Sequence, residues 1–229
     1  MGIADRLRAV QDRIAQAARA AGRDPATIQL VAVSKTVEAA AIAELLAAGH
    51  TVCGESRPQA LRDKARALAG RPVRWHFIGP LQTNKIKYVY PIVELIHSVD
   101  RPELLDALRQ WARKTGRRCP CLLEVHISDE PTKQGFAPDE VLSVIAGLRN
   151  DPDLDVRGLM GMAPFVSEEA PVRSAFRRLA ELFRASRDLE GPAYHAQELS
   201  MGMTDDYPIA IEEGATIVRI GRALFGDHP

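Results

Sequence analysis

The sequence predicts an α/β fold, a (β/α)8 TIM barrel with an extra N-terminal helix. Three observations favour it: eight short apolar segments recur along the chain, segments of helical periodicity separate them, and 229 residues suit one barrel domain. An open doubly wound sheet usually has a glycine-rich turn after its first strand, whereas this chain has Ser34-Lys35-Thr36 there. We therefore expect a single barrel domain over residues 1–229.

A helix is expected first, over roughly Gly2 to Ala21, where the segment is charged and amphipathic. The strand candidates are Ile28–Ser34, Thr51–Glu55, Val73–Gly79, Leu95–Val99, Cys121–Ile127, Val156–Met162, Tyr194–Leu199 and Thr216–Gly221. Nearly continuous apolar runs of this length are typical of parallel strands that are covered on both faces.

Helices are predicted between the strands, because apolar residues recur there three and four positions apart. Two such sets are Leu104, Leu105, Leu108, Trp111 and Ala112, and Val172, Ala175, Phe176, Leu179, Leu182 and Phe183. Asp100 is the expected N-cap of the first set, with Pro102 in the first turn and Glu103 completing a capping box. Glycines stand where helices should end, at Gly49, Gly116 and Gly214.

Composition excludes several classes of function. Thirty basic and thirty acidic residues cancel, so no overall field attracts nucleic acid or an anionic membrane, and no apolar run approaches the roughly 18 residues of a membrane span. Cys53, Cys119 and Cys121 form an odd set without a secretory leader, which favours a soluble protein of the reducing cytoplasm. The Cys119-Pro120-Cys121 spacing does not suit a zinc knuckle, and we interpret it as structural.

Lys35 is the leading candidate for chemistry, because it follows the apolar run Ile28 to Val33, where a cationic side chain has no packing role. It should lie at the carboxyl end of the first strand, the end at which barrels build their sites. Apolar neighbours would lower the pKa of its amine and make it nucleophilic, which suits Schiff-base formation. The alternative is a lysine whose stem packs while its head reaches water.

Two loops are candidates for a phosphate site, because barrels often bind phosphate after strands seven and eight. Ser200, Met201 and Gly202 form the first loop: the serine offers a hydroxyl, and the glycine allows backbone N–H groups to approach. Gly221 and Arg222 form the second, at the start of a helix whose free N–H groups favour an anion. The alternative is a tight turn and a packing glycine.

Arg219 should point into the barrel, since it alternates with Ile217 along the last strand. It could pair with Glu124 of strand five or contact a bound heterocycle, and the sequence leaves both open. A metal site is a weaker alternative, because no local spacing links its candidate ligands. Those ligands are His76, His126, His195 and Glu55.

Taken together, these features resemble the alanine racemase N-terminal barrel, and more closely the single-domain pyridoxal phosphate homeostasis proteins. The motifs that carry the resemblance are AVSKT at Ala32–Thr36, GES at Gly54–Ser56, WHFIGPLQTNK at Trp75–Lys85, ISDEPTKQGF at Ile127–Phe136, RGLMGMAPF at Arg157–Phe165, LSMGMTDD at Leu199–Asp206 and VRIGRALFG at Val218–Gly226. The resemblance implies pyridoxal 5'-phosphate (PLP) bound covalently as a Schiff base on Lys35, with its phosphate held by Ser200, Gly202 and Gly221. It implies that Arg219 faces the pyridine nitrogen and keeps it unprotonated, which weakens the cofactor as an electron sink.

The sequence departs from that family's pattern at three positions. Ser56 and His126 stand where asparagines are usual, and Arg222 replaces a small hydroxyl residue in the phosphate loop. The change at Arg222 should lose a hydroxyl contact and add a charged one.

The preferred interpretation is a binding protein for intracellular PLP homeostasis, without turnover beyond the reversible Schiff base. The alternatives are a PLP-dependent racemase-like enzyme with weak activity and a lysine-dependent aldolase acting on a phosphorylated sugar. Racemases need an acid/base group on each face of the substrate carbon, and none of the four tyrosines lies in a motif that marks it as one. We expect a monomer whose candidate partners are apo PLP-dependent enzymes.

Overall fold

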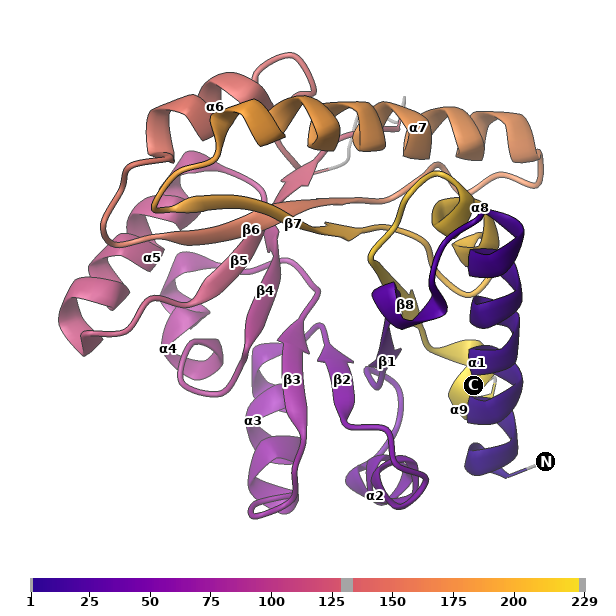
Figure 1. Ribbon diagram of the computed structural model, residues 1–229. Helices are drawn as coiled ribbons and strands as arrows, with labels where there is room; N and C mark the ends of the chain where they lie inside the picture. Colours follow the sequence, from indigo (N-terminus) through magenta and orange to yellow (C-terminus); the bar gives the residue numbers. More distant parts are fainter. Residues whose placement is uncertain (1, 129–133, 227–229) are drawn as a thin grey trace.

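In the computed structural model, which describes residues 2–128 and 134–226, eight parallel strands close into a barrel (Figure 1). Each strand pairs with the next along the chain, and β8 pairs with β1. The strands are β1 (Gln29–Val33), β2 (Val52–Glu55), β3 (Arg74–Phe77), β4 (Leu95–Val99), β5 (Pro120–Val125), β6 (Asp155–Gly161), β7 (Tyr194–Ser200) and β8 (Ile217–Ile220). All eight predicted strands are confirmed, with ends shifted by a few residues.

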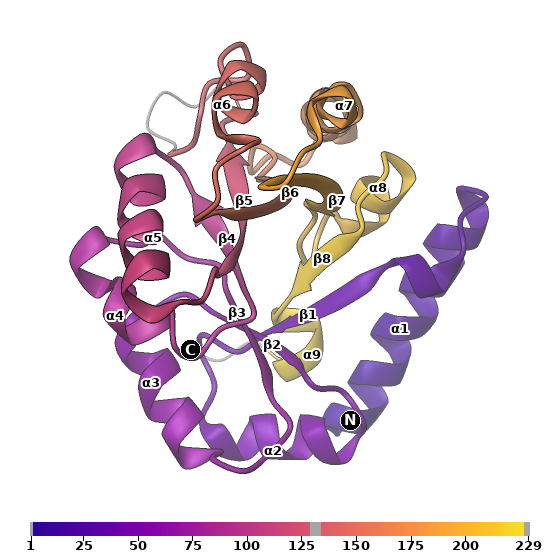
Figure 2. The same cartoon turned by 60° about the vertical axis from the view of Figure 1, so that its left-hand side comes forward.

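The helices form a ring around the strands, as Figure 2 shows. They are α1 (Ile3–Ala20), α2 (Ala39–Ala47), α3 (Pro58–Ala67), α4 (Ile86–Val89), α5 (Pro102–Thr115), α6 (Val141–Leu148), α7 (Glu169–Ala185), α8 (Tyr207–Glu212) and α9 (Arg222–Phe225). The extra helix α1 precedes the barrel and lies beside α9, where Arg6 Nε donates to the carbonyl of Leu224 at 2.8 Å. The predicted (β/α)8 barrel with an additional N-terminal helix is therefore confirmed.

The barrel interior contains an apolar layer. This layer is a separate buried cluster, made of Val31, Val52, Leu95, Leu122, Met160 and Ile217. Because side chains alternate along a strand, the residues two positions further on face the same interior, nearer the carboxyl ends. His97, Glu124 and Arg219 occupy such positions, and all three are buried. The apolar layer therefore supports a polar layer, as the alternation of Arg219 with Ile217 predicted.

The predicted cap of α5 is wrong. The N-cap is Arg101, without a side-chain cap, and Asp100 instead accepts a hydrogen bond from the Arg101 guanidinium at 2.5 Å. The ion pair draws the carboxylate away from the first backbone N–H groups of the helix. Gly116, at the other end of α5, has the left-handed conformation that its position predicted, with φ 66°.

The three cysteines are buried and unpaired. Burial raises the pKa of the Cys53 and Cys119 thiols to about 12, so both stay protonated and unreactive at neutral pH. For Cys119 this agrees with the structural role inferred from the Cys119-Pro120-Cys121 spacing. In the part of the chain that the structure describes, no helix combines the length and apolar character of a membrane span.

Gly158 allows β6 and β7 to approach closely. Its φ is +141°, and a Cβ at this position would lie 2.0 Å from the Glu198 carbonyl oxygen, next to a shift in strand register. We expect Gly158→Ala to lower the free energy of unfolding by about 3 kcal/mol or more, since neither backbone can move away. Gly147→Ala is the matched control, because a Cβ there meets nothing within 4 Å and should stabilise α6 by about 0.5–1 kcal/mol. Chemical denaturation measures both changes, and equal midpoints would contradict the assignment.

Candidate functional site

Lys35 lies in the turn that directly follows β1, at the carboxyl end of the barrel. Its position is therefore the predicted one, but its environment is not. The side chain is exposed, so the expected enclosure among apolar neighbours is wrong. The strand ends at Val33, and Lys35 stands beyond the part that neighbouring strands cover. An exposed amine at the barrel mouth is accessible to a ligand arriving from solvent.

The turn carrying Lys35 is fixed from outside the barrel by α3. Lys64 Nζ lies 2.6 Å from Glu55 Oε2 and donates to the carbonyl of Ser34, also at 2.6 Å. Glu55 is fully buried and only about a tenth of Lys64 is exposed, so water screens this pair weakly. Arg57 adds a hydrogen bond to the carbonyl of Lys35 at 3.1 Å. Two cations thus hold the carbonyl groups of Ser34 and Lys35 in place.

The loops after β7 and β8 lie next to this turn. Gly221 packs against β1, where an added Cβ would be 3.2 Å from the carbonyl oxygen of Val33, two residues before Lys35. Gly202 has φ +92°, and its carbonyl accepts a hydrogen bond from the Arg219 backbone N–H at 2.9 Å. The Lys35 turn, the Gly221 turn and the Gly202 loop therefore meet at one side of the barrel mouth.

Two neighbouring residues shape the loop after β7. Met201 is buried, and its N–H donates to the carbonyl of Ile217. The Asp206 carboxylate accepts a hydrogen bond from the Met203 N–H at 2.6 Å, which closes a turn immediately after Gly202. These two hydrogen bonds fix the position of the loop relative to the start of β8.

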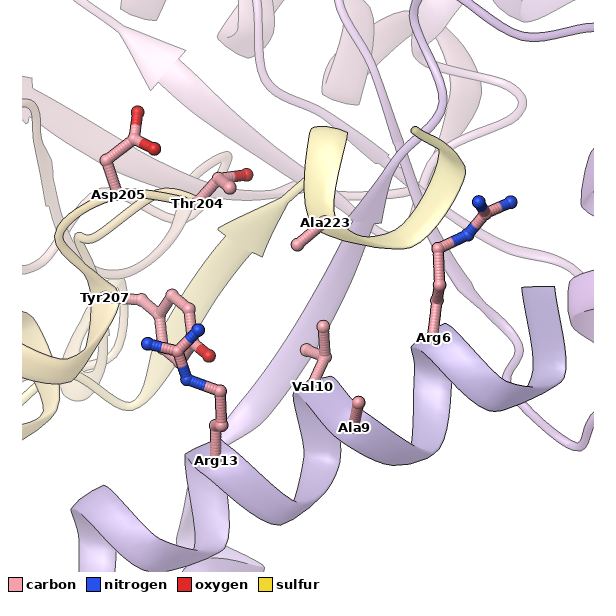
Figure 3. A pocket seen from close by; sticks show the side chains of 8 residues that line it. All are labelled: Arg6, Ala9, Val10, Arg13, Thr204, Asp205, Tyr207 and Ala223. Atoms are coloured by element: carbon pink, nitrogen blue, oxygen red, sulfur yellow. The ribbon is translucent and has the colours of Figure 1, made fainter. Parts of the chain in front are cut away.

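Figure 3 shows the side of these loops that faces α1. A cavity of about 450 Å³ is lined by Thr204, Tyr207 and Ala223 and by Arg6 and Arg13 of the helix. The guanidinium of Arg13 stacks over the Tyr207 ring, 5.8 Å from its centroid.

Arg222 also belongs to this outer region. Its exposed guanidinium is paired with Asp205, so in this structure its charge is directed to a neighbouring loop.

Arg219 is the most deeply buried cation of the site, with 4% of its surface exposed. Its Nη1 donates to Ser200 Oγ at 2.6 Å and its Nη2 donates to the carbonyl of Gly161 at 3.2 Å. Burial lowers the pKa of Arg219 to about 10, which still leaves the group charged at neutral pH. Among the described residues it forms no ion pair, and the carboxylates of Glu124 and Asp206 act on it only through longer-range attraction. The direct Glu124 pair considered from the sequence is therefore not formed.

Ser200 connects Arg219 to two buried histidines. His97 Nδ1 lies 2.8 Å from Ser200 Oγ, and His97 Nε2 lies 2.9 Å from His76 Nδ1. An arginine can only donate, so the serine oxygen accepts from Arg219, and its own proton has an acceptor if it goes to His97 Nδ1. His97 then donates from Nε2 to His76. The sequence predicted that the Ser200 hydroxyl binds a phosphate. In this structure the hydroxyl accepts a hydrogen bond from Arg219.

The metal alternative finds no support in this arrangement. Glu55 binds Lys64, and His76 binds His97. Within residues 2–128 and 134–226, no group of three histidine, cysteine or carboxylate side chains is arranged to hold an ion. Part of the ISDEPTKQGF motif, residues 129–133, lies outside the described residues.

Comparisons with known proteins agree with this geometry. A family model described as the alanine racemase N-terminal domain matches residues 6–229. A protein of Pseudomonas aeruginosa named pyridoxal phosphate homeostasis protein is 42% identical over 98% of this chain and 95% of its own length. A protein of the same name from Aquifex aeolicus is 41% identical over 100% of this chain and 99% of its own length.

A solved structure gives the same result. PipY of Synechococcus elongatus PCC7942, with PLP bound, is 33% identical, has a TM-score of 0.81, and covers 98% of this chain and 100% of its own. The chain belongs to the pyridoxal phosphate homeostasis protein family, within the alanine racemase N-terminal domain family.

For this member of the homeostasis family, sequence reasoning missed two residues of the site. His97 and Lys64 were not singled out. A usable signal was present for His97, because a polar residue inside a wholly buried strand needs a partner. Lys64 gave no such signal, since a lysine on an amphipathic helix is ordinary.

The buried histidines and Glu124 should give this family member opposing dependences of stability on pH. Burial lowers the pKa of His76 to about 3 and that of His97 well below its ordinary value. Below about pH 6.5 these residues take up protons in the unfolded chain before they do in the folded one. They therefore lower the free energy of unfolding as the pH falls. Burial, with the charge of Asp100, raises the pKa of Glu124 to about 7, so this group lowers stability as the pH rises from about 4.5 to 7.

We therefore expect His76→Asn to flatten the loss of unfolding free energy between pH 6.5 and 4.5, by up to about 1.4 kcal/mol per pH unit. Glu124→Gln should make the same loss steeper. Denaturant titrations at several pH values measure the slopes. Slopes that change in the same direction in both variants would rule out this origin of the pH dependence.

Lys64→Met should leave the Glu55 carboxylate buried without its partner and cost about 3–5 kcal/mol of stability. Adding Glu55→Gln should recover part of that loss, because the uncompensated charge is removed. Lys87→Met, on the exposed face of α4, serves as the control and should change stability little. Thermal denaturation of the wild type, Lys64→Met, Glu55→Gln, the double variant and Lys87→Met gives the comparison, and additive losses in the double variant would argue against a coupled pair.

Proposed function

We propose that this protein binds PLP at the barrel mouth and serves intracellular PLP homeostasis as a carrier or buffer of the cofactor. One observation carries the proposal: Gly221, which begins the loop after the last strand, packs against Val33, only two residues before the exposed Lys35. An amine that can condense with an aldehyde thus stands beside a turn suited to a phosphate. The PLP bound to PipY and the names of the curated relatives support the same ligand.

The residues present fit this cofactor. When bound, PLP supplies an aldehyde that Lys35 captures as a Schiff base with release of water, and the capture reverses by hydrolysis. Gly202 and Gly221 hold the phosphate through backbone N–H groups, because both glycines leave room where a Cβ would meet neighbouring atoms. The Met201 N–H is bound to the Ile217 carbonyl, so Met201 supports this phosphate loop from its buried position. Arg222 adds positive charge at the rim when its guanidinium leaves Asp205 and turns to the phosphate.

Arg219 faces the ring nitrogen in this proposal. Its charge at neutral pH opposes protonation of that nitrogen, and Ser200 contributes by fixing the guanidinium rather than by touching the phosphate with its hydroxyl. A pyridine that stays unprotonated stabilises a carbanion poorly, which suits storage better than turnover.

The tyrosines also favour a carrier over a racemase-like enzyme. A racemase needs a second acid/base group beside the substrate, and the buried tyrosines point elsewhere: Tyr90 donates to the carbonyl of Arg117, Tyr194 bonds to Ser186, and Tyr207 faces α1. Tyr88 lies on α4 beneath the cations of Arg62, Lys85 and Lys87. We propose a single cytoplasmic, monomeric barrel domain that exchanges PLP with apo PLP-dependent enzymes.

Lys35→Ala should abolish covalent capture of PLP. The wild-type protein mixed with PLP should gain a visible absorbance band, and borohydride should convert the linkage into a stable adduct that mass spectrometry maps to Lys35. Lys114→Ala is the matched control, since this exposed lysine is in the last turn of α5, away from the mouth. A band that persists in Lys35→Ala, or a wild-type protein that takes up no PLP in excess, would contradict the proposal.

A second measurement separates the carrier from the racemase-like enzyme. The PLP-loaded protein is incubated with single L-amino acids, and the enantiomers are resolved by chromatography. A carrier produces no sustained interconversion. Interconversion by the wild type that disappears in Lys35→Ala would establish the enzyme.

A further inference from the structure

The outer face of β7 is incompletely covered by the helical ring. α7 has 17 residues and lies along β6 and β7, whereas α8, the helix between β7 and β8, has only six (Figure 1). A cavity of about 530 Å³ opens between the two helices, and Ala196, Leu199 and Thr216 contribute to its wall. It lies on the outside of the barrel, separate from the interior that Arg219 occupies.

Four arginines line this cavity. Arg177 and Arg184 come from α7, Arg187 follows α7, and Arg23 belongs to the turn after α1. Three of them lie within residues 177–187, and the fold adds Arg23 from a distant part of the sequence.

Only one of the four has its charge balanced. Arg177 binds Glu213 through two nitrogens, Nε at 3.2 Å and Nη2 at 3.1 Å. Arg23 donates to the carbonyl of Ile211 at 2.8 Å, Arg184 donates to the carbonyl of Ala180 at 3.3 Å, and the Arg187 guanidinium lies 5.9 Å from the centroid of the Phe183 ring. None of these three forms an ion pair with any carboxylate that the structure describes.

The acidic residues of the cavity compensate them only in part. Glu212 and Glu213 both bind Arg173, a residue of α7 outside the cavity lining, at 2.6 and 3.0 Å. Arg173 also binds Glu169, so Arg173 and Arg177 share three carboxylates and leave one negative charge uncompensated. The three unpaired guanidinium groups outnumber it, and the cavity keeps an excess of positive charge. A bound anion balances that excess.

We propose that this cavity binds a small multivalent anion bearing phosphate or carboxylate groups, independently of the barrel mouth. Guanidinium groups present paired N–H donors that match the oxygens of both kinds of group. The volume lies in the range of small-molecule sites, which favours a compact ligand over a protein segment.

The test uses the full-length protein and two probes, inorganic pyrophosphate and citrate, with binding measured by isothermal titration calorimetry. We expect at least one probe to bind with a Kd below about 1 mM, more weakly as salt rises. The stronger probe identifies phosphate or carboxylate as the favoured group. Arg184→Gln with Arg187→Gln should weaken that binding at least tenfold.

Two further variants and the PLP-loaded protein define the site. Arg178→Gln is the matched control, because this exposed arginine is on α7 but does not line the cavity, and it should leave binding unchanged. Gln197→Glu places a carboxylate on the exposed rim and should abolish binding while raising the melting temperature. Wild-type protein saturated with PLP should bind both probes as strongly as the free protein, which separates this site from the proposed PLP site. Absence of binding by both probes, equal loss in Arg178→Gln, or competition by PLP would overturn the proposal.

Discussion

The rest of the site depends on one constraint, the burial of the Arg219 charge inside a closed barrel. A guanidinium that is 4% exposed must find hydrogen-bond acceptors within the protein, because water cannot supply them. Ser200 of β7 and the carbonyl of Gly161 of β6 are those acceptors. Each acceptor fixes the guanidinium from a different direction. Arg219 thereby joins β6, β7 and β8 near their carboxyl ends, where the loops of the site begin.

Neutral histidines make this burial possible without adding charge. Burial keeps His97 and His76 unprotonated at neutral pH, so the chain from Arg219 through Ser200 ends in neutral rings rather than in a second cation. Glu124 sits in the same layer with its pKa raised to about 7, close to the point at which it is half ionised. Arg219 is thus the group of the polar layer that stays fully charged at neutral pH. The apolar layer next to it excludes water from the barrel interior.

Local patterns predicted the elements, whereas the contacts of the site required the closed barrel. Alternation with Ile217 was enough to direct Arg219 inward, because period-two geometry belongs to the strand itself. The bond between His97 and Ser200 joins residues 103 positions apart, and only the ring order of the strands brings them together. The predicted Asp100 cap failed because a neighbouring arginine offered the carboxylate a charged partner. Enclosure of Lys35 failed because β1 ends two residues before it.

The shortness of α8 links the barrel mouth to the outer arginine cavity. The loop after β7 can pack directly on α8 only because Gly202 has no side chain, since a Cβ there would lie 2.6 Å from the Ala210 Cβ and 2.9 Å from the Tyr207 Cα. A helix that begins so close to the mouth holds that loop firmly, but α8 ends after six residues and leaves the outer side of β7 open. The backbone N–H of Leu199 donates to Thr216 Oγ1 at 2.8 Å, and both residues line the cavity one position before Ser200 and Ile217. The same two strands therefore present the proposed phosphate loops at the mouth and the wall of an anion site on the outside.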